Sequence, residues 1–241
     1  SKEEVDAKIL NKNEHTIRMR IPVEGDISFE DLVYGKINTK CSELDDFIIA
    51  RSDGSPTYNL TVVVDDNDMN ISHVIRGEDH ISNTPKQILI YKALGWTLPK
   101  FGHLPMILGS DGKRLSKRHG AKGTIDYKDL GYLPDTLINY LALLGWNPGN
   151  DDEIFDFNYL QENFSLDKVN KKSAVFDTTK LEWVSSQNIF KIPAAKLVDI
   201  ASEFDPTWCG EGHSLDHLVN VINLIKDRIK TLSDIKENAF Y

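Results

Sequence analysis

The sequence predicts an α/β domain followed by an all-α region, and three features of the chain lead to this prediction. Residues 60–64 form a short apolar run rich in β-branched side chains, which is typical of a strand buried on both faces. Residues 72–76 resemble its partner strand, and the pattern of a helix follows. Beyond residue 130, apolar residues recur at helical spacing instead. We therefore expect strands and helices first and helices alone afterwards.

The first fifty residues are expected to form a small β-rich unit. Residues 15–22 alternate between apolar and polar side chains, and residues 37–39 and 47–49 read as further short strands. After the pair at 60–64 and 72–76, Thr84 is the expected N-cap of a helix, with Pro85 at its first position. Gly95 is expected to end that helix. A strand, a polar turn and a helix make a βα unit, whose ligands gather beyond the carboxyl ends of the strands.

The second half of the chain is predicted to be helical. Leu133 and Pro134 open a helix that Gly145 closes. Further helices are expected at residues 157–162, 166–171, 179–187, 194–203 and 215–232. We place the boundary between the two regions at residues 124–129.

Composition limits the kind of protein. The 241 residues carry a formal net charge of −9 and 40% hydrophobic residues, enough for a substantial core. No apolar run approaches the length of a membrane span, and no signal peptide opens the chain, so we expect no membrane association. With only Cys41 and Cys209, a disulfide framework is not implied and a reducing cytoplasm is the expected location.

A basic segment stands out in this acidic chain. Residues 112–121 hold four Lys or Arg side chains and one His, and no Asp or Glu occurs from residue 113 to residue 124. Gly112 and Gly120 allow the backbone to turn and to approach a ligand closely. A solvated basic turn is the alternative for an arbitrary cluster of this kind. The composition of the segment suits a phosphate group.

The order of these residues carries a resemblance. Residues 114–118 resemble the K-M-S-K-S signature loop of the class I aminoacyl-tRNA synthetases, and Leu-Ser-Lys-Arg-His-Gly-Ala is similar to its form in glutamyl-tRNA synthetases. Residues 56–66 and 73–80 resemble the same family, in the right order. Residues 29–35, 45–54 and 176–181 extend the likeness, which covers about residues 15–190. Arg114 at the first motif position departs from the family pattern but keeps the charge.

The resemblance implies four segments. Residues 1–50 correspond to a remnant of the acceptor-binding insertion, and residues 51–126 to the C-terminal half of a Rossmann-type catalytic domain with the signature loop. Residues 127–190 correspond to a helical stem-contact domain, and residues 191–241 to the start of the helical anticodon-binding region. The resemblance further implies ligation of L-glutamate to tRNA(Glu) through a glutamyl-adenylate, with ATP and its Mg²⁺, by a monomer.

The resemblance also implies roles for particular residues. In the signature loop, Lys117 is the expected catalytic cation, with Arg114, Ser116 and Arg118 beside it. Positioned cations accelerate adenylate formation when they meet charge that builds up on the triphosphate. In the amino-acid pocket, Tyr58 and Arg76 are expected to bind glutamate. ATP is expected to contact Asp79, the backbone of Leu108, and Lys117.

Each assignment has a structural alternative. Arg76 could form an internal ion pair with Glu78 or Asp79, and Tyr58 could be an ordinary core aromatic. Cys209, His213 and His217 are spaced four apart, so a zinc site is conceivable there, but glycines interrupt any shared helical face and we expect no metal site. His103 is expected to be a buried histidine with its hydrogen bonds satisfied.

One family element is missing. None of the seven His residues stands in a H-I-G-H-like pattern, which the family carries soon after its first strand. We therefore expect the chain to be a fragment that is inactive alone. The alternatives are a stand-alone tRNA-binding module, a glutaminyl-tRNA synthetase, or a shortened relative that glutamylates a modified tRNA base. Helices after residue 130 argue against the shortened relative.

Overall fold

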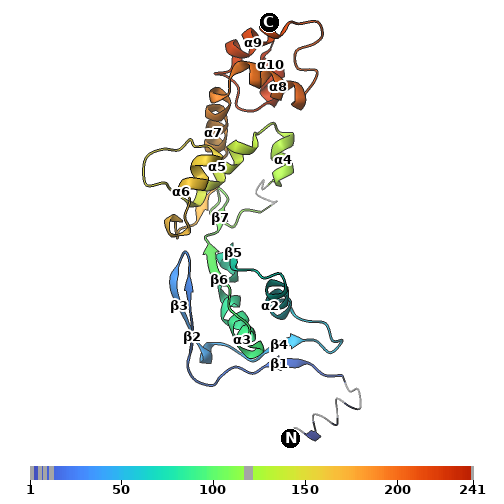
Figure 1. The fold of residues 1–241 in the computed structure, drawn as a ribbon, viewed down its shortest axis with the longest axis vertical. Coiled ribbons are helices and arrows are strands. Elements are labelled where there is room, and N and C mark those ends of the chain that lie inside the picture. The colour runs from blue at the N-terminus through green and yellow to red at the C-terminus, as the bar shows by residue number, and fades with distance from the viewer. Residues whose placement is uncertain (1–2, 5–6, 8–9, 11–13, 117–121, 240–241) are drawn as a thin grey trace. The chain divides into compact units, whose positions relative to one another are not determined.

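The structure is a computed structural model, and it describes residues 3–4, 7, 10, 14–116 and 122–239. By its internal contacts the chain divides into two compact units, Ser1–Leu104 and Pro105–Tyr241. Figure 1 shows strands and helices in the first unit and mainly helices in the second. In the described part, no helix is long and apolar enough to cross a bilayer.

A four-stranded mixed sheet organises the first unit, in the order β3-β2-β6-β5. β2 and β3 form an antiparallel hairpin, whereas β6 runs parallel to both β2 and β5. The strands are β2 (Asp26–Asp31), β3 (Gly35–Lys40), β5 (His73–Gly77) and β6 (Lys100–Leu104). A separate two-stranded sheet pairs β1 (Ile17–Met19) with β4 (Phe47–Ala50). The predicted strands near residues 15–22, 37–39 and 47–49 are thus confirmed, while β2 and β6 were not predicted.

The predicted strand at residues 60–64 is wrong. These residues belong to α2 (Tyr58–Asp68), an 11-residue helix that begins after Thr57. Periodicity cannot separate a short apolar run in a strand from one in a helix, and here the helix continues through the polar residues 65–68. The predicted strand at residues 72–76 is confirmed as β5, but its partner is β6, which follows α3 in the chain.

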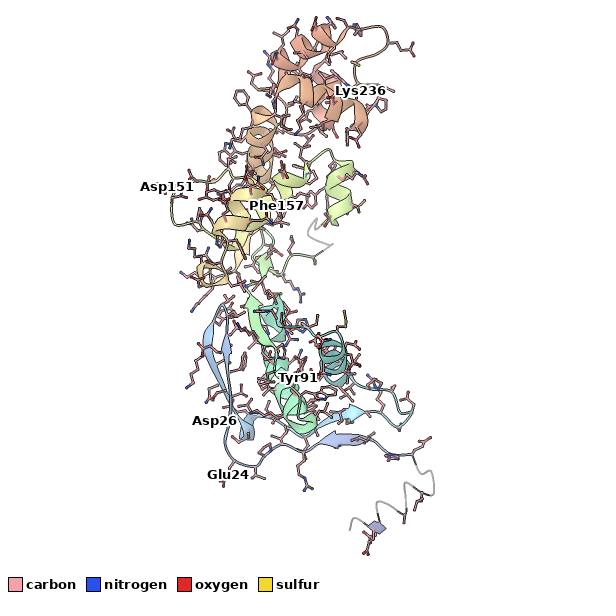
Figure 2. The ribbon with its side chains drawn as sticks, viewed as in Figure 1. Glu24, Asp26, Tyr91, Asp151, Phe157 and Lys236 are labelled. Atoms are coloured by element: carbon pink, nitrogen blue, oxygen red, sulfur yellow. The ribbon has the colours of Figure 1, made fainter. Side chains whose placement is uncertain are left out.

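Helix α3 (Thr84–Leu94) links β5 to β6, and a short 3₁₀ segment, η2 (Glu78–Asn83), precedes it. The predicted helix is confirmed, although Asn83 rather than Thr84 takes the N-cap position. Gly95 ends it with φ of 71°, a left-handed conformation that glycine adopts without strain. Ile88 and Leu89 of α3 pack on the sheet, whereas Tyr91, labelled in Figure 2, packs with Val63 of α2. α3 therefore has sheet on one side and α2 on the other.

The second unit is built mainly from helices. They are α4 (Thr124–Asp129), α5 (Pro134–Gly145), α6 (Phe157–Asn163), α7 (Thr178–Lys191), α8 (Ala194–Phe204), α9 (Leu215–Ile225) and α10 (Ser233–Asn238). The helices predicted for α5, α6, α7 and α8 are confirmed. α5 and α7 pack around Tyr140, Leu181 and Val184, and α8 to α10 enclose a second apolar core.

Three predictions for this unit need correction. Residues 166–171 contain only the 3₁₀ turn η4 (Leu166–Lys168). Residues 215–232 are not one helix, because turns follow α9 and the carboxylate of Asp234 then accepts the backbone N–H groups of Lys230 and Thr231. The unit is also not purely helical, since β7 (Ile107–Leu108) pairs in parallel with β8 (Ala174–Val175).

Candidate functional site

Three charged or titratable side chains lie at the carboxyl ends of the parallel strands. Asp31 is the last residue of β2, and Arg76 and His103 are each next to last in β5 and β6. Arg76 is the register partner of His103 in the β5–β6 pair. Side chains at matched positions of neighbouring parallel strands point to the same face, so this edge gathers them.

The guanidinium of Arg76 is held by three uncharged groups. Its Nε donates to Nε2 of His103 at 3.2 Å, and its Nη2 lies 2.9 Å from Oγ1 of Thr84 and 2.8 Å from Oε1 of Gln87. Thr84 and Gln87 are three residues apart at the start of α3, hence on one face of the helix, and both are almost completely buried. Sequence and fold together therefore fix the direction of the guanidinium.

The charge of Arg76 is not cancelled by direct contact. No ion pair formed among the described residues includes Arg76, so the alternative of an internal pair with Glu78 or Asp79 is not observed. Burial lowers the pKa of Arg76, while the hydroxyl of Tyr58 and the carboxylate of Asp66 oppose that shift. A guanidinium stays protonated in proteins, so this site presents a positive charge.

Tyr58 lies at the start of α2 and is 50% exposed, which rules out the alternative of a core aromatic. Its hydroxyl is 3.4 Å from Nδ1 of His80, and the two rings lie 6.0 Å apart. Tyr58 also interacts with Arg76, which it helps to keep charged. A hydroxyl and a guanidinium thus share one accessible region.

Asp79 lies in η2, directly after β5. Its Oδ2 is 3.9 Å from Nε2 of His80, a distant ion-pair geometry. A Cβ at Gly77 would come within 2.6 Å of Oδ1 of Asp79, so only glycine allows this carboxylate its present position. Asp79 therefore lies just beyond the carboxyl end of β5, the edge at which ligands gather in parallel sheets.

The described part of the basic loop forms a tight hairpin in the second unit. Leu108 and Arg114 face each other across an antiparallel bridge, and Gly112 turns the chain with φ of 73°. The carbonyl of Leu108 accepts the N–H of Phe176 at 2.8 Å. Ser116 is half-buried. The two further predicted loop residues, Lys117 and Arg118, lie outside the described residues.

The predicted residues thus fall into two groups. Tyr58, Arg76 and Asp79 lie together in the first unit, and Leu108, Arg114 and Ser116 follow one another along the loop of the second unit. Sequence reasoning missed the groups that hold Arg76, namely Asp31, Thr84, Gln87 and the part played by His103. Only the i, i+3 spacing of Thr84 and Gln87 was readable, because strand register is needed to bring the others together.

The conceivable zinc residues do not make a built site in the described part of the chain. The rings of His213 and His217 stack with centroids 4.7 Å apart. Among the residues that the structure describes, no three His, Cys, Asp or Glu side chains gather in a way that could hold a metal ion.

Comparison with known proteins identifies the family of this chain. A sequence model of the class I tRNA synthetases (E and Q), catalytic domain, matches residues 1–183. The chain belongs to this family. Among curated class I synthetases of this kind, it is 48% identical to a glutamate–tRNA ligase of Herminiimonas arsenicoxydans, over 92% of the chain and 48% of the relative. It is 49% identical to a glutamate–tRNA ligase of Thermodesulfovibrio yellowstonii, over 96% of the chain and 50% of the relative.

Solved class I synthetases have the same fold over nearly the whole chain. A glutamate tRNA ligase from Elizabethkingia meningosepticum, solved in complex with its amino acid, is 30% identical with a TM-score of 0.87. That match covers 99% of this chain and 51% of the solved one. The glutamate–tRNA synthetase of Elizabethkingia anophelis gives a TM-score of 0.85. The chain therefore spans about half the length of the relatives it matches.

Proposed function

We propose that this chain belongs to an enzyme that joins L-glutamate to tRNA through a glutamyl-adenylate made from ATP. The observation that carries the proposal is Arg76, a cation at the carboxyl end of β5 whose described hydrogen bonds all reach uncharged groups. Membership in the class I tRNA synthetases (E and Q) and the names of the relatives support the reaction.

Arg76 suits a carboxylate of the amino acid. Its bonds to His103, Thr84 and Gln87 use three of the five N–H donors of a guanidinium, so the two hydrogens on Nη1 remain for a ligand. The ligand carboxylate would then meet one nitrogen rather than a bidentate fork. The hydroxyl of Tyr58, half exposed beside it, would supply a second hydrogen bond. A charged, partly desolvated contact of this kind is stronger than a neutral hydrogen bond.

ATP would be bound by the remaining predicted residues. Asp79 offers a carboxylate for ribose or adenine, the backbone of Leu108 a contact for adenine, and the basic loop cations for the triphosphate. Lys117 is the residue that we assign to transition-state charge, with Arg114, Ser116 and Arg118 tuning the field. Mg²⁺ would enter together with ATP, as the family resemblance implies.

The segments would divide the contacts with tRNA. We assign residues 1–50 to contacts with the acceptor end of the tRNA, residues 51–126 to catalysis, and residues 127–190 to contacts with the tRNA stem. Residues 191–241 are assigned to the start of the helical anticodon-binding region. We further propose a cytoplasmic, monomeric enzyme with tRNA(Glu) as its partner. The pairing of β7 with β8 supports a connection between the loop segment and the stem-contact segment, since it joins residues 107–108 to residues 174–175.

The test is Arg76→Ala in the protein that contains this chain, at its natural length. The Michaelis constant for glutamate should rise steeply, because a carboxylate would lose its charged partner. About 2–5 kcal/mol is the scale for truncating one member of a buried charge pair. Amino-acid-dependent exchange of pyrophosphate into ATP, measured with tRNA present, gives the constants for glutamate and for ATP separately.

Asp66→Asn serves as a matched control, because Asp66 acts on Arg76 through its charge and forms no hydrogen bond with it in the described part of the chain. It should change the Michaelis constant for glutamate far less than Arg76→Ala does. Near-normal glutamate kinetics in Arg76→Ala would refute the assignment. Repeating the assay with glutamine tells which carboxylate is bound: a loss confined to glutamate indicates the side-chain carboxylate, and an equal loss indicates the α-carboxylate.

A further inference from the structure

Behind Arg76 lies a buried pair that the proposed reaction does not use directly. Nδ1 of His103 is 2.6 Å from Oδ2 of Asp31, and both side chains are completely buried. They come from the neighbouring parallel strands β6 and β2, whose register sets Asp31 opposite Phe101. The chain of contacts therefore runs from Asp31 through His103 to Arg76, across three strands.

Both carboxylate oxygens of Asp31 accept hydrogen bonds in this arrangement. Its Oδ1 accepts the backbone N–H groups of Val33 and Tyr34, each at 2.9 Å, and of His103 at 3.3 Å. Burial alone would raise the pKa of Asp31, but the bonds from Tyr34, His103 and Val33 outweigh it, so the pKa lies below its ordinary value. Asp31 is thus an ionised acceptor, and both of its carboxylate oxygens receive hydrogen bonds.

The proton positions on His103 follow from its partners. Arg76 can only donate, so Nε2 of His103 must be the acceptor in their 3.2 Å bond. Nδ1 must then carry the hydrogen that Oδ2 of Asp31 accepts. The imidazole is therefore neutral, with a defined tautomer, between an anion and a cation.

We propose that Asp31 and His103 are positioning residues that hold the guanidinium of Arg76 in the orientation that binds the substrate carboxylate. This inference rests on the proposed function, because it assigns Arg76 to the amino acid. Asp31 fixes the tautomer and the ring of His103, and His103 fixes the Nε edge of Arg76. Thr84 and Gln87 hold Nη2, so the Nη1 hydrogens are presented in one direction.

Protonation of His103 would break this arrangement. Burial lowers the pKa of His103 below 6.5, Asp31 opposes that shift, and Arg76 and His80 add to it. The neighbouring groups from α3, Thr84 and Gln87, are uncharged. As the pH falls through this lowered pKa, Nε2 gains a hydrogen and can no longer accept from Arg76. The Michaelis constant for glutamate should therefore rise on the acid side of pH 6.5.

Two substitutions of His103 separate its hydrogen bond with Asp31 from its hydrogen bond with Arg76. The amide nitrogen of His103→Asn matches Nδ1 and can still donate to Asp31, but nothing replaces Nε2. The amide oxygen of His103→Gln matches Nε2 and can still accept from Arg76, but the donor to Asp31 is lost. His103→Asn leaves the Nε–H of Arg76 without its acceptor and removes the 3.2 Å contact between Nε2 and Oγ1 of Thr84, whereas His103→Gln leaves Oδ2 of Asp31 without its donor. Both variants should therefore lose stability.

The experiment measures both variants in the protein that contains this chain, at its natural length. His103→Asn should raise the Michaelis constant for glutamate about tenfold or more, equivalent to one charged hydrogen bond. The constant for ATP should stay unchanged, and His103→Gln should remain within about threefold of the wild type. In His103→Gln the rise of the Michaelis constant for glutamate at acid pH should vanish, whereas in His80→Gln this rise should persist. The inference would be overturned if the two His103 variants changed the Michaelis constant for glutamate equally. It would also be overturned if this constant still rose at acid pH in His103→Gln.

A measurement without substrate separates this inference from the proposed function. The solvent exchange of the Arg76 Nε–H, followed by ¹⁵N NMR and assigned by its loss in Arg76→Lys, should accelerate in His103→Asn and stay slow in His103→Gln. Equal exchange in both variants would contradict positioning even if the protein activates glutamate. If the wild type shows no glutamate-dependent exchange of pyrophosphate, the proposed function fails, while the NMR result still decides the positioning of Arg76.

Discussion

At the scale of single residues, the sequence indicated Tyr58 and Arg76 as candidate ligand-binding residues, but it did not indicate the groups that support Arg76. Both were predicted from a resemblance; Arg76 lies near the carboxyl end of β5, and Tyr58, at the start of α2, interacts with it. Asp31 and His103 could not be paired from the sequence, because 72 residues separate them and only the parallel register of β2 and β6 brings them together. His103 was expected to be a satisfied buried histidine, and its contacts confirm that expectation.

Lys117 provides the residue-scale prediction for the basic loop. If it stabilises charge that develops on the triphosphate, Lys117→Ala should lower the rate of adenylate formation by about a hundredfold or more, the scale for losing one preorganised donor. Arg118→Ala is the neighbouring control and should cost less. Single-turnover formation of glutamyl-adenylate at saturating ATP, glutamate and tRNA separates chemistry from binding. A raised Michaelis constant for ATP with an unchanged saturated rate would show that the loop clamps phosphate uniformly.

At the scale of elements, helix ends were easier to predict than strands. Helix α5 begins at Pro134 and ends at Gly145 as expected, because these residue types act locally on the backbone. α2 was mistaken for a strand, since a five-residue apolar run fits either structure. The two-residue strands β7 and β8 have no sequence pattern of their own, and they exist because the tertiary fold pairs them.

Gly131 provides a prediction at this scale. It joins α4 to α5 with φ of 82°, and its carbonyl accepts the N–H of Leu232 just before α10. A Cβ there would meet the backbone nitrogen of Ser233 at 2.7 Å, so Gly131→Ala should lower the free energy of unfolding by about 1–3 kcal/mol.

Gly149→Ala is the matched control for this prediction. Gly149 also has a positive φ, of 98°, but a Cβ there meets nothing within 4 Å. Urea unfolding of both variants would therefore separate backbone strain from the close approach to Ser233. Equal losses in the two variants would show that the contact between residue 131 and residues 232–233 adds nothing.

At the scale of the whole molecule, the net charge of −9 conceals a local concentration of basic residues. The sequence predicted family and segment order because its motifs are local, and the family match over residues 1–183 confirms the family. The domain limits stay a prediction. Internal contacts divide the chain into two units after Leu104. This division depends on long-range packing, so no local sequence pattern predicts it.

The central claim is that Arg76 and its surroundings belong to a site for the glutamate carboxylate in a tRNA-charging enzyme. Exchange of pyrophosphate into ATP, measured with tRNA present in the protein that contains this chain at its natural length, tests it most directly. L-Glutamate should support exchange, glutamine should support far less, and Arg76→Ala should lose the response to glutamate. Exchange that prefers glutamine, or that is absent with glutamate in the wild-type protein, would contradict the account.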